Sequence, residues 1–381
     1  MRIAAILMIL AGCKAAMPAG RAVATTDGAI ALGNLDAQIA GQERLLERER
    51  GSVIDAAALV ELLQARAQYT GRIADYDRAA EAAEEAVRVA PHQADALLVR
   101  AGSRAALHRF PEALADANAA LKLGADEVKV AGLRSSVFQA QGRLAEALAL
   151  RRQAVRVHAT TQSVGALAAA EAAIGDRAAA ERDFDEAVRL YRDTSPFPLA
   201  WIDFQRGLLR EKAGDLQGAH ASYSAALLRL PQYAQAAAHL AALEAMEGSR
   251  ARAVELLRPL ASLDDPEYAG QLAALLPDSQ GSALRESARA RFEALLARHP
   301  QAFADHAARF FLARDPRRAL ELAVKNLEVR RTWEAFDLAL TAASAAGVDG
   351  CEIASQALAL PNPPRRIQFL AGRCRIAAAG P

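Results

Sequence analysis

The chain has 381 residues, of which 46 are basic and 45 acidic, so its formal net charge is +1. A balance this even argues against a nucleic-acid binder, because such proteins usually carry a stripe of excess Lys and Arg. Only 5% of the residues are aromatic although 52% are hydrophobic, and this composition favours helices that pack through Ala and Leu.

The first thirteen residues, MRIAAILMILAGC, predict an export signal. The apolar run from Ile3 to Leu10 is too short to cross a bilayer as a helix but suits the core of a cleaved signal. The end of this segment, Leu-Ala-Gly-Cys, resembles a bacterial lipobox, which implies a signal peptide over residues 1–12 and diacylglycerol on Cys13. Lys14 then implies a periplasmic protein anchored in the outer membrane by its lipid. The alternative is a plain secretory signal that is cleaved between about Ala19 and Ala24.

Residues 13–26 are small and unpatterned, which predicts a flexible tether. Asp27 can cap a helix over residues 27–50, in which Leu32, Leu35, Ile39 and Leu46 follow helical spacing. We expect this helix to cover the open end of the structure that follows. A coiled-coil seam is the alternative, although only about two heptads are available for it.

The middle of the chain repeats one pattern, a turn followed by an alanine. These alanines are Ala79, Ala113, Ala147, Ala180, Ala219 and Ala253, and their spacings are 34, 34, 33, 39 and 34 residues. The clearest copy, from Ala200 to Pro231, predicts two helices around Gly214-Asp215, with Gly207 and Tyr223 where the helices would meet. The longer step contains RDTSPFPL, from Arg192 to Leu199, whose prolines are expected to prevent a helix.

This pattern resembles the tetratricopeptide repeat (TPR) family. The resemblance implies an all-α fold, a right-handed superhelix with six TPR units over residues 51–260. After Leu260 the pattern loosens, and residues 261–381 are expected to form degenerate helical hairpins and a closing helix, with a loop from Pro277 to Gly281.

The resemblance also implies which side chains line the concave groove of the superhelix. In the first and third units these include Gln64, Gln68, Lys129 and Ser136. The fifth unit has Trp201, Phe204, Leu208 and Glu211, which suggests an apolar anchor for a protein or peptide partner. Alternatively, the two aromatic residues pack against the neighbouring insertion. The basic and amide residues with which some TPR domains hold a terminal carboxylate are absent apart from Lys129, so a chaperone adaptor of that type is not expected.

We find no motif for catalysis, a metal or a cofactor. The seven histidines are scattered, and the sequence contains no HExxH, CxxC, GxSxG or phosphate-binding glycine motif. Cys351 and Cys374 would meet if their helices are antiparallel, so they are either a disulfide or two buried thiols. We therefore expect a non-catalytic scaffold tethered in the cell envelope. The alternatives are a constitutive subunit of an envelope enzyme or secretion complex, and a hydrolase with an unrecognised site after Leu260.

Overall fold

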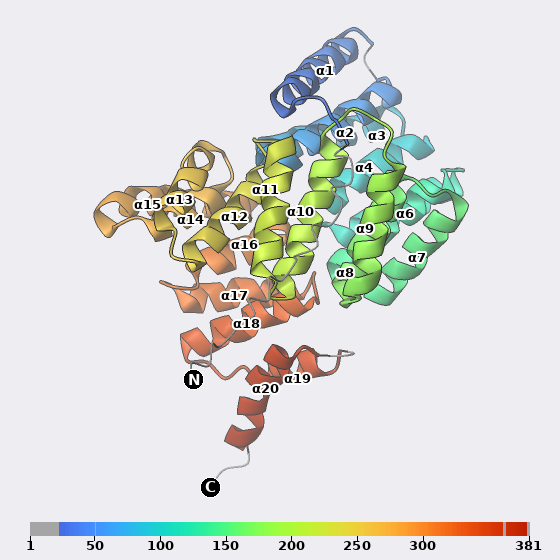
Figure 1. The fold of residues 1–381 in the computed structure, drawn as a ribbon. Coiled ribbons are helices and arrows are strands. Elements are labelled where there is room, and N and C mark those ends of the chain that lie inside the picture. The colour runs from blue at the N-terminus through green and yellow to red at the C-terminus, as the bar shows by residue number, and fades with distance from the viewer. Residues whose placement is uncertain (1–22, 50, 361–362, 379–381) are drawn as a thin grey trace, which may run out of the picture.

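A computed structural model describes residues 23–49, 51–360 and 363–378, with side chains as far as residue 371. These residues form twenty α-helices and one short 3-10 helix, with no strand among them (Figure 1). Most helices are joined in antiparallel pairs that stack side by side. The predicted all-α solenoid is therefore confirmed.

The helices that flank the hairpins are the N-terminal α1 (Gly28–Arg48) and the C-terminal α20 (Arg365–Ala378). The first six hairpins, called units one to six, are α2 (Val53–Thr70) with α3 (Ala74–Val89), α4 (Ala94–Ala106) with α5 (Phe110–Lys122), α6 (Glu127–Gln141) with α7 (Leu144–Val157), α8 (Thr161–Ile174) with α9 (Arg177–Leu190), α10 (Phe197–Lys212) with α11 (Leu216–Arg229), and α12 (Ala234–Met246) with α13 (Arg250–Leu257). After the 3-10 helix Leu260–Ser262 come α14 (Pro266–Leu275), α15 (Asp278–Arg298), α16 (Pro300–Phe311), α17 (Pro316–Leu327), α18 (Trp333–Ala346) and α19 (Cys351–Leu358).

Small side chains let the two helices of a unit approach closely. The six repeated alanines are each at most 1% exposed, and four of them share a hydrophobic cluster with the other helix of their unit, namely Ala79, Ala180, Ala219 and Ala253. In unit five, a Cβ added to Gly207 would lie 2.3 Å from Cε1 of Tyr223, whose ring is fully buried. The periodic small residues of the sequence are thus the residues at which helix packs on helix.

Two predicted loops are shorter than expected. Pro196 caps α10, which already begins at Phe197 with Pro198 in its first turn. Likewise α15 begins at Asp278, directly after Pro277. The expectation that prolines prevent a helix was wrong at Pro198, because the first turn of a helix has no partner for its N–H groups and tolerates proline. The loop predicted from Pro277 to Gly281 was wrong from Asp278 onward.

The N-terminal helix α1 covers unit one, as predicted. Leu35 and Ile39 pack with Leu59 and Leu63 of α2 in one hydrophobic cluster. Asp27 caps α1, since its carboxylate accepts the backbone N–H of Ala29 at 2.9 Å. The cap therefore supplies the apolar surface that the first hairpin of a solenoid otherwise lacks.

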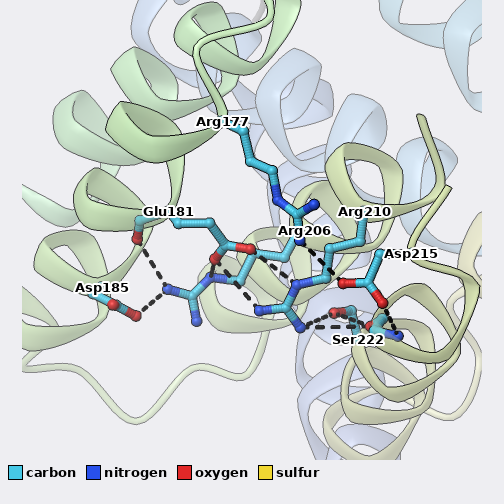
Figure 2. Close-up of polar contacts among 8 residues, drawn as sticks. Arg177, Glu181, Asp185, Arg206, Arg210, Asp215 and Ser222 are labelled. Carbon is cyan, nitrogen blue, oxygen red and sulfur yellow. Dashed lines mark hydrogen bonds and ion pairs between the residues drawn. The ribbon is translucent and has the colours of Figure 1, made fainter. Parts of the chain in front are cut away.

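Arginines of units two, three and five contact the unit before them. Arg100 of α4 donates to Glu84 of α3 at 3.1 Å, and Arg134 of α6 donates in the same way to Asn118 of α5. Figure 2 shows the fullest version, between units four and five, where Arg206 and Arg210 of α10 contact Glu181 and Asp185 of α9. Arg210 also donates to Ser222 of its own unit at 2.9 Å. In the ion pairs of this set the arginine side chains are only 16–27% exposed, and these contacts hold neighbouring hairpins together.

The solenoid winds far enough for its beginning to touch its second half (Figure 1). Asp264, which precedes α14, accepts the backbone N–H groups of Ile73 at 2.9 Å and Ala74 at 2.7 Å, and thereby caps α3 from 190 residues away. At unit two, Nδ1 of His108 lies 3.2 Å from the carbonyl oxygen of Gln301. At unit three, the backbone N–H of Arg331 donates to the carbonyl oxygen of Gln141 at 3.2 Å. The first three units therefore contact the segment before α14, the start of α16 and the segment before α18.

Candidate functional site

The surface formed by the first helices of units one to six is the one predicted to bind a partner, and we call it the inner face. Along α6 of unit three, Lys129 and Ser136 are exposed, and Gly132 lies between them. A Cβ added to Gly132, or to Gly102 on α4, would meet no atom within 4 Å. The inner face of units two and three is therefore open, and a partner-binding role for Lys129 stays a prediction.

In unit five the inner face is filled by aromatic side chains. Phe204 is only 5% exposed, and its ring centroid lies 5.1 Å from that of Tyr233 and 5.7 Å from that of Tyr223. Tyr69 of unit one completes the cluster, with its ring 5.0 Å from Tyr233 and 4.9 Å from Phe197. Its hydroxyl donates to the carbonyl oxygen of Phe197 at 3.1 Å. Phe204 is therefore a core residue in this structure, and the idea that it offers an open anchor is corrected.

Trp201 and Leu208 are half-buried beside this cluster. Trp201 packs against Gly165 in α8 of unit four. The ring lies so close to this glycine that an added Cβ would be 3.3 Å from the Cζ3 atom of Trp201. Phe197, which belongs to the proline-containing segment, contacts the same cluster. The surroundings of these aromatic residues thus favour the packing alternative, while a role in binding for Leu208 is still a prediction.

Glu211 is held by two neighbours. Its Oε2 atom accepts the hydroxyl proton of Tyr223 and lies 3.1 Å from Nδ1 of His239 on α12. Burial would raise the pKa of this carboxyl, but the hydrogen bonds from His239 and Tyr223 outweigh burial and lower it. The sequence pointed to Glu211 and missed His239, because the histidine belongs to the next unit and has no motif of its own.

The two glutamines of unit one lie on α2, which packs against α12. Gln64 and Gln68 are both half-buried, and the amide nitrogen of Gln64 is buried without a hydrogen-bond partner in the described residues. Contact between α2 and α12 reduces the space available to a partner at this end of the inner face.

A charged cluster joins α14, α16 and the segment after α17. Nδ1 of His306 lies 2.6 Å from Glu267, and Arg330 donates to Asp305 at 3.2 Å. Burial acts to lower the pKa of His306, but the carboxylates of Asp305 and Glu267 raise it to about 10. A histidine that stays protonated at neutral pH cannot act as a general base, so this cluster is suited to holding helices together.

Several predictions concern residues outside the described part of the chain. Cys13, residues 1–12 and most of the tether lie there, so the lipid anchor and the outer-membrane location remain predictions. Cys351 is disulfide-bonded at the start of α19, but the side chain of its predicted partner Cys374 is not among those described. Within the described residues, no helix combines the length and apolarity needed to span a membrane, and no group of three or more His, Cys, Asp or Glu side chains could hold a metal ion.

No protein-family model matches this chain, and no curated protein matches it significantly. Solved structures with a similar arrangement of helices include a human IFIT1 dimer with PPP-AAAA, at 14% identity over 91% of this chain and 78% of that one, with a TM-score of 0.48. Yeast Tom70 is 13% identical over 92% of this chain and 94% of its own, with a TM-score of 0.39. YrrB, described as a TPR protein with an unusual peptide-binding site, is 19% identical over 55% of this chain and 100% of its own, with a TM-score of 0.31. Likenesses this distant carry no argument about sites or partners.

Proposed function

We propose that this protein is a non-catalytic scaffold that binds a segment of another protein on the inner face of units two and three. The observation that carries the proposal is the open surface at Gly102 and Gly132, where an added Cβ would meet no atom within 4 Å. Helices stacked side by side provide a continuous surface on which a partner segment can lie. The filled inner face of unit five would mark one end of this surface.

We further propose that the scaffold is tethered in the cell envelope through Cys13. Support comes from the lipobox-like sequence and from the contacts that Val23 and Thr26 make with the body of the protein. The carbonyl oxygen of Val23 accepts a hydrogen bond from Arg229 at 3.2 Å, and the N–H of Thr26 donates to the carbonyl oxygen of Thr194 at 2.7 Å. A tether that joins the body beside units four and five would keep the inner face at a high local concentration near the membrane.

The experiment is a crosslinking pull-down from membranes with three forms of the full chain. The blocked form carries Gly102→Leu and Gly132→Leu, which place bulky side chains on the inner face. The matched control carries Gly33→Leu on α1, where an added Cβ also meets no atom within 4 Å. Both forms should stay folded, because leucine favours a helix over glycine by roughly 1 kcal/mol.

We expect wild type and the Gly33→Leu control to capture the same envelope protein, and the blocked form to lose it. Equal capture by all three forms would show that the partner binds elsewhere on the solenoid. A captured protein that stays in fixed stoichiometry through purification would favour the constitutive-subunit alternative over a reversible scaffold.

A further inference from the structure

Unit three has an arginine where units four and five have a buried aromatic ring. Phe184 and Tyr223 each lie four residues after the repeated alanine of their units, and both are fully buried. The corresponding residue of unit three, four residues after Ala147, is Arg151. A guanidinium therefore occupies a place in the hairpin that otherwise belongs to the core.

No carboxylate of the described residues pairs with Arg151. One Nη atom donates to Oγ of Ser136 at 2.7 Å, while the Nε atom is buried and has no hydrogen-bond partner among these residues. Burial lowers the pKa of this guanidinium. Arg100 of unit two is a contrast, since it donates to Asp116 at 2.8 Å and to Glu84 at 3.1 Å. A partly buried cation without a counter-ion destabilises a fold, so its presence here indicates a role other than stability.

This arginine reaches the open strip of the inner face through its hydrogen bond to α6. Ser136, its hydrogen-bond partner, is exposed on α6. Lys129 lies seven residues earlier on the same side of that helix, about 10 Å away along its axis, and forms no ion pair within the described part of the chain. Between them Gly132 leaves space for a backbone to approach. Two cations and a hydroxyl thus border one accessible strip.

We propose that Lys129, Ser136 and Arg151 form a subsite that binds acidic side chains of the partner segment. This proposal rests on the proposed function and adds the chemical class of the partner. Carboxylates would provide the counter-ion that Arg151 lacks, through charge-assisted hydrogen bonds. An acidic peptide fits better than a nucleic acid, because the subsite has two cations and the chain as a whole has a net charge of +1.

The test uses fluorescein-labelled hexaglutamate and the full chain, with binding followed by anisotropy. Arg151→Met removes the buried cation, and Arg156→Met removes an exposed arginine of the same helix as the matched control. We expect Arg151→Met to weaken binding by about tenfold or more, the effect of losing charge-assisted hydrogen bonds, while Arg156→Met binds like wild type. Arg151→Met should also unfold at a higher temperature, which separates lost binding from lost folding.

Either of two results would overturn the proposal. One is hexaglutamate binding that is undetectable or is equal in both variants. The other comes from competition against the labelled hexaglutamate. If a thymidine dodecamer displaces it at a much lower concentration than unlabelled hexaglutamate does, the ligand is a nucleic acid. If hexaglutamate does not bind but the form with Gly102→Leu and Gly132→Leu still loses the captured protein, the scaffold function stands and only the acidic subsite is wrong.

Discussion

Replacing Gly207 with alanine should destabilise the protein, although alanine is the better helix former. The glycine lies in α10 and is packed against the ring of Tyr223 in α11. An added Cβ would lie 2.3 Å from Cε1, 2.5 Å from Cδ1 and 2.9 Å from Cζ of that ring. Carbon atoms prefer to be about 3.5–4.0 Å apart, so the ring has to move by more than about 1 Å.

The ring has little freedom to do so. Its hydroxyl donates to Glu211, and its ring centroid lies 5.7 Å from that of Phe204, which is itself buried. Overpacking a rigid core destabilises by roughly 1–3 kcal/mol, and we expect the upper end here. Alanine gains about 1 kcal/mol of helix propensity over glycine, which leaves a net loss of about 2 kcal/mol.

The assay compares denaturant unfolding of Gly207→Ala with that of Gly132→Ala. The second change has the same propensity gain, but its Cβ meets no atom within 4 Å, so it should stabilise the protein by up to about 1 kcal/mol. The two variants should therefore shift the unfolding midpoint in opposite directions. If Gly207→Ala is at least as stable as wild type, the packing of units described above is wrong.

Three further predictions concern single side chains. Asp264→Ala should weaken the cap of α3 by about 1 kcal/mol, seen as faster hydrogen exchange in its first turn, and unchanged exchange there would contradict the cap. Burial and the nearby Asp183 raise the pKa of Glu171 from 4.5 to about 7, so the folded state holds a proton that the unfolded chain releases above about pH 4.5. The stabilisation from this proton should be lost as the pH rises towards about 7, and the unfolding temperature of Glu171→Gln should vary less over that range than that of wild type. His108 has a φ of 57°, so His108→Gly should be more stable than His108→Ala by about 1 kcal/mol in denaturant unfolding, and the reverse order would show that the strain is unimportant.

The repeated pattern of the sequence was enough to predict the hairpins and the capping helix. Each repeated alanine is buried, and the apolar residues of α1 lie at helical spacing after the cap residue Asp27. These features depend on residues that are close in the chain, so their periodicity is visible without coordinates. The role of Arg151 could also have been suspected, because it breaks the pattern at a position where units four and five have Phe184 and Tyr223.

Which side chains of the inner face are open and which are buried was decided by the tertiary structure. The position of Phe204 in its repeat predicts that it lies on an open surface. In the structure it is buried in an aromatic cluster that includes Tyr69, which lies 135 residues earlier in the chain. Asp264 likewise caps α3 from 190 residues away, and the local sequence of neither segment indicates this contact. Such contacts arise from the small rotation between successive units, which accumulates along the solenoid until its beginning meets its second half. Local spacing determines each hairpin, whereas this accumulated rotation decides which inner side chains remain open to a partner.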